Sequence, residues 1–495
     1  MLNGEQAARR PWTVPALGLS WPLVVASAVF LLLLGRPQLL NDGDIYWHVV
    51  MGQWILQHLA IPLQDVYSHT LFGSRWTAHE WLSEVLFAFA FDKAGWTGVV
   101  MLAAFASALA FAAATRFFLR HLQPIYALAL SVLSASLLAP HLVARPHALI
   151  APVIVVWCVA LVRARENGQA PPVLLALLMV VWANLHGSFI VGLGLAGALA
   201  LEAVLDCATT EARRRAAQGW GLFLLSALAA SLSTPFGVQG LLFAIRVDQM
   251  AVALGNIGEW RSPDFQKLQP LELWLMVGGA VILARGIRLP AVRIGLVLGM
   301  LHLALKHARH ADLLALAGPV LLAGPFAAQW DRVSRSAAEG HGLDRWFNSL
   351  VPPARSVTVG FVLAVLFLAG LRQMQADTLH PADAVTPQAA LHAAREAGLE
   401  GPVLNAYEFG GYLIFSGVSP FIDGRTDLYG DEFVRLYLGA VNSTRPGSLQ
   451  HLLKRYDIGW TLLPPQLPAV SLLDHLPGWR RVYEDATAVV HARNR

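Results

Sequence analysis

Charged residues are scarce in this chain. Only 14% of its 495 residues are Asp, Glu, Lys or Arg, whereas 56% are apolar, and a typical soluble domain is roughly a quarter charged. The mean hydropathy is +0.52. So little charge cannot cover a soluble surface, which excludes an ordinary cytosolic enzyme, a disordered chain and a coiled coil. The composition therefore predicts a polytopic membrane protein.

Cysteine is nearly absent as well. Cys158 lies in an apolar run and Cys207 just after one, which excludes a disulfide framework and a cysteine-based zinc site. The chain after residue 372 has no GxGxxG or Walker A pattern, so no nucleotide site is indicated there. Nothing in the sequence indicates a nucleic-acid partner.

What the chain does contain is long apolar runs. Crossing the hydrocarbon core takes about 20 helical residues, and eleven runs reach or approach that length. They cover residues 17–35, 96–115, 124–143, 147–162, 172–186, 188–205, 219–234, 271–284, 291–305, 311–329 and 356–371. We therefore expect an α-helical polytopic membrane protein with about eleven transmembrane helices.

Arginines occupy every second connection between these runs. After Arg9 and Arg10 they recur at 116 and 120, 163 and 165, 213–215, 285–293, and 332–345. By the positive-inside rule this predicts a cytoplasmic N-terminus and a periplasmic C-terminal segment, most simply in a bacterial inner membrane. The pattern also requires residues 81–91 to form a helix inside the first external loop. The first run is not expected to be a cleaved signal peptide, because Arg36-Pro37 follows it without a small-residue cleavage site.

Two domains are expected. A transmembrane domain covers residues 1–372, including the first external loop at 36–95, and an external soluble α/β domain covers 373–495. In the loop, Ile45, Val49 and Gly52, followed by Leu56 and Leu59, have the spacing of an amphipathic helix, which we expect to lie in the membrane interface. In the tail, strands are expected at 403–405, 420–423, 459–463, 480–483 and 488–491, with helices at 431–441 and 446–455.

Ionisable residues are costly at membrane depth and usually mark function. With the predicted topology they gather on the external side. The candidates are Asp42, Asp44, His79, Glu80, Arg145, His147, His186, Glu259, Arg261, Lys306, Arg309 and His310. Their common side indicates a polar cavity that opens to the outside.

The Asp42-Gly43-Asp44 motif follows the first apolar run. Two carboxylates two residues apart can share a divalent cation such as Mg²⁺ or Mn²⁺ or a sugar hydroxyl, or one can act as a base. The same residues are also typical of a solvent-exposed turn. Because His79 and Glu80 lie in the same loop, we favour a functional role.

Lys306, Arg309 and His310 lie three and four residues apart, as one stripe at a helix end would. Cations on the external side run against the positive-inside bias, so a lipid phosphate is a natural partner. Pairing with Asp312, or snorkelling to headgroups, would also explain them.

The remaining candidates each have a structural alternative. Arg145 is a second phosphate candidate, although Arg145-Pro146-His147 also suits a helix entry. His186, like Asn184, could hydrogen-bond between helices, and Glu259 could pair with Arg261. His79 and Glu80 could cap a helix. In the tail, the loop 423–427 is expected to be salt-bridged.

The first hundred residues resemble a known family. An N-terminal span is followed by Asp42-Gly43-Asp44 with Tyr46, then by a helix reaching Ile61-Pro62, and then by the Trp-Thr-Ala-His-Glu-Trp-Leu sequence at 76–82. This arrangement resembles the GT-C superfamily of polytopic glycosyltransferases, especially the branch of bacterial protein O-mannosyltransferases and aminoarabinose transferases.

The resemblance implies a membrane glycosyltransferase. It implies a polyprenyl-phosphate-linked sugar donor, an envelope acceptor (lipid, glycan or protein), and contact with membrane lipids. Asp42 matches the family's catalytic acidic position, Asp44 the second acidic one, and Glu80 a polar position at the next loop helix. Gly43 interrupts the usual Asp-Glu pair, and His79-Glu80 replaces a frequent Lys-Pro-Pro, so donor type and metal requirement stay open.

Two other functions are alternatives to a glycosyltransferase. A transporter or flippase of a lipid-linked sugar needs a polar cavity, but the chain shows no internal repeat and no paired broken helices. A scaffold that binds an envelope partner would leave Asp42 and Asp44 without a role.

Overall fold

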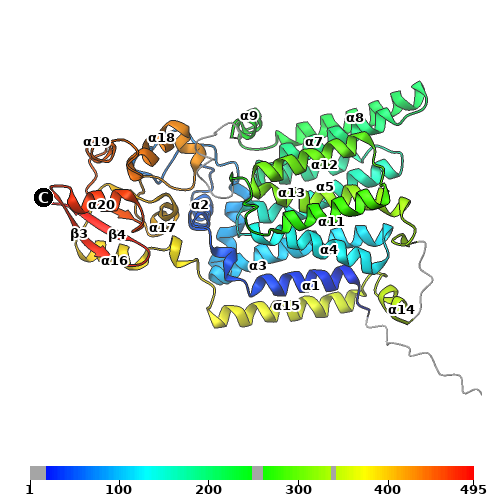
Figure 1. The fold of residues 1–495 in the computed structure, drawn as a ribbon, viewed down its shortest axis with the longest axis horizontal. Helices are drawn as coiled ribbons and strands as arrows, with labels where there is room; N and C mark the ends of the chain where they lie inside the picture. Colours follow the sequence, from blue (N-terminus) through cyan, green and yellow to red (C-terminus); the bar gives the residue numbers. More distant parts are fainter. Residues whose placement is uncertain (1–17, 248–259, 336–341, 495) are drawn as a thin grey trace, which may run out of the picture.

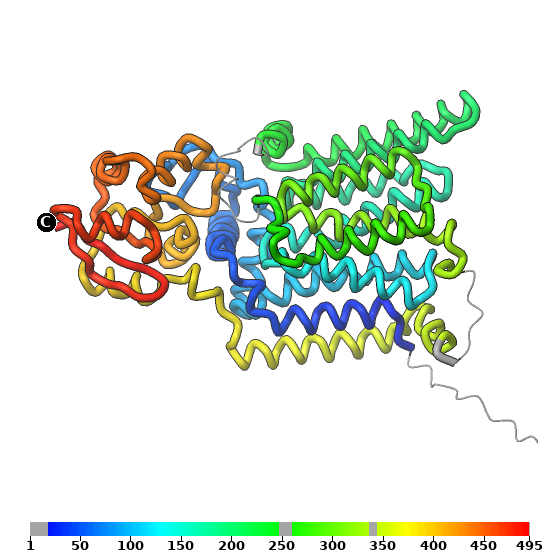
Figure 2. The backbone as a smooth tube through the Cα atoms, viewed as in Figure 1, coloured from blue at the N-terminus to red at the C-terminus, as the bar shows by residue number. Residues whose placement is uncertain are grey.

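The computed structural model describes residues 18–247, 260–335 and 342–494. A bundle of apolar helices occupies one side of the molecule, and the chain after residue 376 forms an α/β part against one end of the bundle (Figure 1). The backbone tube shows the blue first-loop segment between these two parts (Figure 2). The first loop therefore contacts both.

Each predicted apolar run falls on a helix. These helices are α1 (Trp21–Leu34), α3 (Trp81–His121), α4 (Pro124–Leu138), α5 (Pro146–Glu166), α6 (Leu177–Leu185), α7 (Phe189–Leu205), α8 (Thr210–Ser231), α11 (Pro270–Arg285), α12 (Ala291–Lys306), α13 (Ala311–Gln329) and α15 (Ser356–Ala376). Among the described residues, five helices are long and apolar enough to cross a membrane. The chain is thus an integral membrane protein, and the count of eleven spans stays a prediction.

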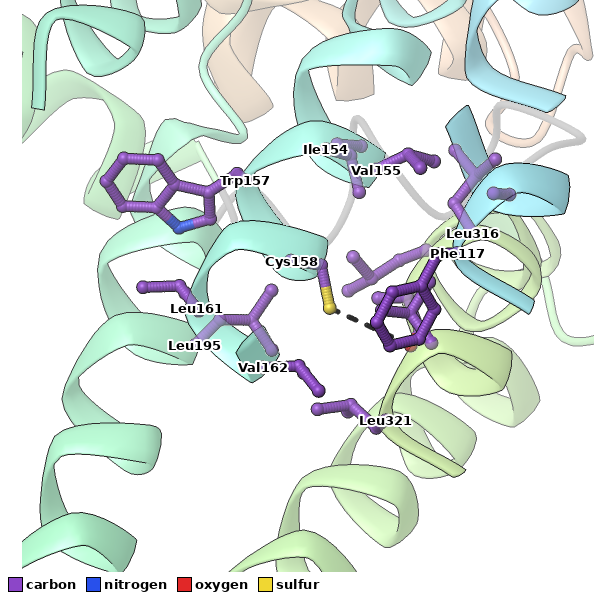
Figure 3. Packing of buried hydrophobic residues seen from close by; sticks show 14 of the residues in the cluster. Phe117, Ile154, Val155, Trp157, Cys158, Leu161, Val162, Leu195, Leu316 and Leu321 are labelled. Carbon is purple, nitrogen blue, oxygen red and sulfur yellow. Dashed lines mark hydrogen bonds between the residues drawn. The ribbon is translucent and has the colours of Figure 1, made fainter. Parts of the chain in front are cut away.

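The bundle core is formed by α3, α5, α7 and α13. Trp157 and Cys158 on α5 pack between Phe117 of α3, Leu195 of α7 and Leu321 of α13 (Figure 3). All five side chains are buried. Close packing of large apolar side chains fixes the positions of the helix ends on which the polar candidates lie.

The first-loop helix is present but packs differently from the prediction. It is α2 (Asp44–His58), and its Ile45, Val49 and Gly52 are buried against α3, while Leu56 and Leu59 are exposed. A side chain at Gly52 would overlap the Glu84 carbonyl, so glycine allows the two helices to touch. Much of the expected membrane-facing stripe is therefore covered by protein.

The helix expected at 81–91 is confirmed as the first part of α3. It is continuous with the next predicted run, and the two are separated only by a bend at Ala94 and Gly95. Gly95 has φ +56°, a conformation that glycine adopts without steric cost. The bend allows the first turns of α3 to follow α2 before the helix enters the bundle.

The α/β part contains one four-stranded sheet in the order β1-β2-β4-β3. The strands are β1 (Val403–Asn405), β2 (Trp460–Leu463), β3 (Trp479–Glu484) and β4 (Val489–Arg493), and only β1 and β2 are parallel. The helices are α16 (Gln388–Glu396), α17 (Gly410–Phe415), α18 (Thr426–Val441), α19 (Ser448–Arg455) and α20 (Pro468–His475). Four predicted strands and both predicted helices are confirmed.

The strand predicted at 420–423 is wrong. Its backbone is held instead by the Asn405 side chain, which accepts from the Phe421 N–H (2.7 Å) and donates to the Ile422 carbonyl (2.8 Å). The apolar pair that suggested a strand is buried, but in a loop fixed by one amide side chain.

The bundle has two chemically different ends. Arg120, Arg163 and Arg165 lie in the last turns of α3 and α5. Arg145 and His186 lie where α5 begins and α6 ends. We call these the arginine end and the first-loop end. The α/β part lies at the first-loop end (Figure 1). Which end faces the cytoplasm stays a prediction.

Candidate functional site

Asp42, Asp44 and Arg145 form one cluster at the first-loop end. Arg145 Nη1 lies 3.1 Å from Asp42 Oδ2, and its Nη2 lies 2.6 Å from Asp44 Oδ2. The Asp42-Gly43-Asp44 segment is a turn into α2, in which the Asp44 N–H donates to Asp42 Oδ1 (2.9 Å). The Asp42-Gly43-Asp44 segment is therefore a turn, as one interpretation held, and its carboxylates are still placed for a functional role, as the other held. Arg145, predicted to bind phosphate, binds the two carboxylates here.

Exposure distinguishes the two acids. The Asp42 side chain is 27% exposed and that of Asp44 is 12% exposed. Asp44 lies directly against Gly424, where any Cβ would overlap its Oδ1 atom. Asp42 is thus the carboxylate that a substrate can reach, whereas Asp44 is covered by the backbone at Gly424.

The α/β part closes over the Asp42-Gly43-Asp44 turn. A Cβ at Gly43 would approach the Glu408 carbonyl to 2.6 Å, and one at Gly411 would overlap the Gly43 carbonyl. Tyr46, at the start of α2, shares a hydrogen bond of 2.8 Å with Thr386. This close approach of the tail to the first loop was not foreseen from the sequence.

Asp427 is a further acid at this end that the sequence did not single out. The Trp76 Nε1–H donates to Asp427 Oδ2 (2.9 Å). Burial raises the pKa of Asp427 above its ordinary value, and the neighbouring His79 and the Trp76 hydrogen bond oppose the rise. The only sequence signal for Asp427 was its partner Trp76, which belongs to the segment at 76–82 on which the family resemblance rests.

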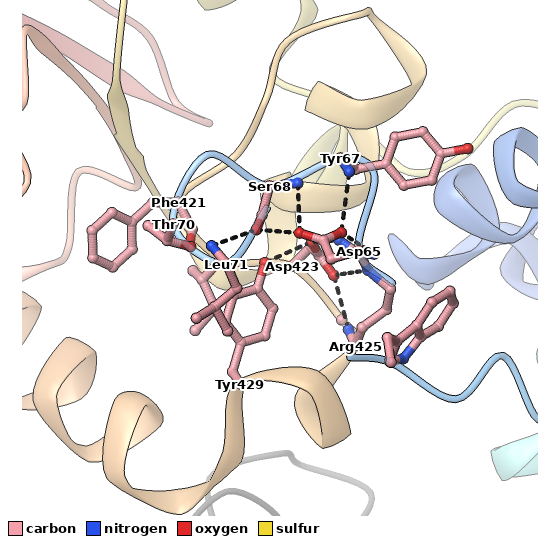
Figure 4. Close-up of polar contacts among 12 residues, drawn as sticks. Asp65, Tyr67, Ser68, Thr70, Leu71, Phe421, Asp423, Arg425 and Tyr429 are labelled. Atoms are coloured by element: carbon pink, nitrogen blue, oxygen red, sulfur yellow. Dashed lines mark hydrogen bonds and ion pairs between the residues drawn. The ribbon is translucent and has the colours of Figure 1, made fainter. Parts of the chain in front are cut away.

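A buried ion network joins the first loop to the tail. Arg425 Nη1 lies 2.6 Å from Asp65 Oδ1, and Arg425 Nη2 lies 2.7 Å from Asp423 Oδ2 (Figure 4). All three side chains are 0% exposed. Tyr429 OH donates to Asp423 Oδ2 (2.8 Å), and Ser68 Oγ donates to Asp65 (2.5 Å). The predicted salt-bridged loop is confirmed, and Asp65 is the partner that sequence reasoning missed.

Glu80 lies between two histidines. Its Oε1 is 3.7 Å from His79 Nε2 and 3.4 Å from His186 Nε2. His186 Nδ1 accepts from the Ser188 N–H (3.0 Å), so in the neutral ring Nε2 carries the proton and faces Glu80. Burial raises the pKa of Glu80, against the charges of His79, Arg145 and Arg309, and burial lowers the pKa of His186 well below its ordinary value.

His79 completes this arrangement. Its Nδ1 lies 3.2 Å from the Thr77 carbonyl, a position that requires the proton on Nδ1. His79 Nε2 faces the Glu80 carboxylate at 3.7 Å. His79 and Glu80 do precede a helix, as the alternative held, but the Glu80 side chain does not cap it and lies between the two histidines. One turn later, Glu84 pairs with His48 (3.8 Å), and both are buried.

The cationic stripe predicted from Lys306 to His310 is wrong. Helix α12 ends at Lys306, and His307 is extended (φ −139°, ψ 119°), so the residues beyond it follow a different direction. Lys306 is exposed, and no ion pair to it occurs among the described residues. Arg309 instead stacks over Trp260, 4.7 Å from the ring centroid, and His310 packs edge-on to the same ring.

The other candidates are placed as follows. His147 Nε2 lies 4.0 Å from Asp312 Oδ2, so Asp312 faces a histidine rather than Lys306.

Asn184 accepts from the Trp81 indole (2.7 Å) and donates to the Ser233 carbonyl (3.0 Å), which confirms its role between helices. Arg261 is exposed. Glu259 lies outside the described residues, so its predicted pairing stays a prediction.

The donor set for a divalent cation is incomplete in the part of the chain that the structure describes. Asp42 and Asp44 offer two carboxylates, and Arg145 already neutralises both. No group of three or more His, Cys, Asp or Glu side chains with metal-binding geometry occurs among residues 18–247, 260–335 and 342–494. The Mg²⁺ or Mn²⁺ site at Asp42 and Asp44 stays a prediction.

Comparison with known proteins supports the fold. No family model and no curated protein sequence matches the chain. Among solved structures it is similar to the oligosaccharyltransferase AglB of Archaeoglobus fulgidus in complex with an inhibitory peptide and a dolichol-phosphate. The TM-score is 0.51 at 11% identity over 90% of this chain and 69% of that one.

A second structure of an oligosaccharyltransferase from the same organism, tethered to an acceptor peptide with the NVT sequon, gives a TM-score of 0.51. The identity is 10% over 89% of this chain and 68% of that one. Identities this low show the fold alone. The similarity supports a fold like that of the oligosaccharyltransferase, whereas membership of the O-mannosyltransferase or aminoarabinose transferase branch is not supported.

Proposed function

We propose that this protein is a membrane glycosyltransferase. It moves a sugar from a polyprenyl-phosphate-linked donor to an envelope acceptor, which is a lipid, a glycan or a protein. The observation that carries the proposal is the partly exposed Asp42 carboxylate, held by Arg145 at the end of an apolar bundle with a fold similar to that of an oligosaccharyltransferase. One AglB structure with this fold contains dolichol-phosphate and an inhibitory peptide, and the second carries an acceptor peptide.

In the proposed reaction Asp42 is the general base. An acceptor hydroxyl has a pKa far above 7, so a carboxylate must take its proton as the oxygen attacks the anomeric carbon of the sugar. The bond from that carbon to the donor phosphate oxygen breaks, and the phosphate leaves with the electron pair. Asp44 and Arg145 hold the Asp42 carboxylate in position, since all three are joined by two ion pairs.

The leaving phosphate needs a positive charge beside it. Arg145 binds two carboxylates, and we assign this role to Arg309. Its charge acts on both Glu80 and His186, so it lies within electrostatic reach of the same cluster. The neutral His186 directs its Nε2–H at Glu80 and so holds that carboxyl in place.

Glu80 is the second candidate for the base. Burial raises the pKa of Glu80, and a carboxyl with a raised pKa is suited to exchanging a proton with a substrate. Its burial places it deeper than Asp42. An acceptor that reaches Glu80 would have to enter between His79 and His186.

Turnover with a labelled donor tests the proposal. Purified protein in liposomes is incubated with a radiolabelled polyprenyl-phosphate sugar and an envelope extract as acceptor. We expect label to leave the lipid-linked pool only when active protein and acceptor are both present. Label that crosses the bilayer while still attached to the polyprenyl phosphate would instead identify a flippase.

A further inference from the structure

A large apolar groove runs along the bundle beside α1. It has a volume of about 1130 Å³, slightly above the usual size of small-molecule pockets, roughly 300–1,000 Å³. Its walls are α1, α3 and α15, with Phe30, Phe105 and Phe367 among the lining side chains. None of the carboxylates or cations assigned to the proposed transfer reaction lines this groove.

The groove faces outward from the bundle. Helix α15 packs on α1 and α3, yet nearly all of its apolar surface is exposed, with Val357 84% and Phe361 69% exposed. In an integral membrane protein such a surface faces lipid. Any molecule that enters the groove sideways therefore comes from the bilayer.

Positive charge collects at one end of the groove. Arg116, Arg120 and Arg335 line it there, together with Asn348. Arg335 Nη1 donates to the Leu119 carbonyl (2.5 Å), which holds its guanidinium near the last turns of α3. Arg163 and Arg116 repel the Arg120 guanidinium, and Glu166 attracts it. This set of like charges is complementary to an anion.

The same end carries a membrane-interface signature. The short helix α14 (Gly342–Ser349) lies beside the start of α1 (Figure 1). The Trp21 indole donates to the Phe347 carbonyl (2.8 Å), and Trp346 packs edge-on to Trp21. Tryptophan and arginine together at a helix end are typical of the depth at which lipid phosphates lie.

We propose that this groove binds an anionic phospholipid. Its acyl chains lie along α1, α3 and α15, and its phosphate is bound by Arg116, Arg120 and Arg335, because guanidinium groups form paired charge-assisted hydrogen bonds with phosphate oxygens. A polyprenyl-phosphate donor fits the apolar walls as well. Its phosphate, however, must reach the carboxylates at the first-loop end, so the arginine end selects a phospholipid.

Native mass spectrometry of the full-length protein tests this proposal by titration with phosphatidylglycerol and phosphatidylcholine. We expect the wild type to bind phosphatidylglycerol more tightly. The R116Q/R120Q variant should lose about tenfold in affinity for phosphatidylglycerol for each arginine removed. The A112F variant, which fills the groove without changing charge, should lose binding of both lipids.

The matched control is R213Q/R214Q, which removes two arginines from α8 at the same end but outside the groove. It should bind phosphatidylglycerol as the wild type does. Equal affinity of the wild type for the two lipids would overturn the proposal. So would equal losses in the two double variants, or displacement of phosphatidylglycerol by polyprenyl phosphate at equal concentration.

Discussion

The Asp42 carboxylate is fixed by its neighbours and is still accessible to solvent. Arg145 fixes its carboxylate through Oδ2, while its other oxygen accepts from the Asp44 N–H, and more than a quarter of the side chain remains exposed. Asp44 is more deeply covered by Gly424. On this geometry we propose Asp42 as the proton acceptor and Asp44 as a positioning residue.

Replacing Asp42 by Asn tests the role of the carboxylate. The amide keeps the shape but cannot accept the acceptor's proton, so transfer should fall by about 10²–10⁴, the usual contribution of a general base. Donor binding and expression should stay near wild type. If Asp42→Asn keeps more than roughly a tenth of the activity, Asp42 is not the base, and Glu80→Gln becomes the variant to measure.

Gly424→Ala tests whether the tail shapes the site. The new methyl group would overlap Asp44 Oδ1 and push that carboxylate away from Arg145. We expect a large loss of transfer with a small change in melting temperature. The control is Gly439→Ala in α18, where the added Cβ meets only Thr444 at an ordinary 3.5 Å. Equal activity of the two variants would show that Asp44 can move without consequence.

Arg309 and Lys306 make a matched pair for the leaving phosphate. Arg309→Ala should weaken use of the donor by roughly ten- to a hundredfold, because a charge-assisted contact contributes about 1.5–3 kcal/mol. Lys306→Ala should change little, since this side chain is exposed beyond the end of α12. The Michaelis constant for the donor is the quantity to compare. Equal effects would place the phosphate elsewhere.

At the scale of elements, the Arg425 network holds the first loop to α18. Removing Arg425 leaves Asp65 and Asp423 buried without their cation, a change that typically costs about 3–5 kcal/mol. Arg425→Met should therefore melt at a clearly lower temperature, measured by tryptophan fluorescence. Combining Arg425→Met with Asp65→Asn and Asp423→Asn should recover part of the lost stability, because the buried carboxylate charges are then removed together with their cation.

The same network predicts a pH dependence. Burial alone would raise the pKa of Asp423, but the Arg425 charge and the hydrogen bonds from Arg425 and Tyr429 outweigh it and lower the pKa. A lowered folded-state pKa gives stability that is present above the ordinary Asp value of about 3.9 and is lost as the pH falls through the folded value. The wild type should lose stability there, and the triple variant should lose less.

Local sequence patterns predicted the helices and strands well, but they did not predict the contacts between them. Apolar runs marked eleven helices, and alternating arginines grouped Asp42, Arg145 and His186 at one end, because hydrophobic length and charge bias are local properties. The link from Asp65 to Arg425 spans 360 residues, and no periodicity encodes such a pairing. The Lys306 stripe failed for a related reason, since helical spacing was extended across a helix end at His307.

For the whole molecule, the α/β part lies at the same end of the bundle as the Asp42 cluster. The positive-inside rule then predicts that both lie outside the cytoplasm. Alkaline phosphatase fused after residue 495 should be active in bacteria, and green fluorescent protein at the same position should be dark. The reverse pattern would place the Asp42 cluster in the cytoplasm and remove the support for an external acceptor.

The most direct test of the central claim is the transfer of label from a radiolabelled polyprenyl-phosphate sugar by the purified, reconstituted protein. Wild type, Asp42→Asn and the remote control Arg213→Ala are compared with the same acceptor extract. We predict transfer by the wild type and by Arg213→Ala, and almost none by Asp42→Asn. Undiminished transfer by Asp42→Asn, or label that stays lipid-linked with every protein, would contradict the account.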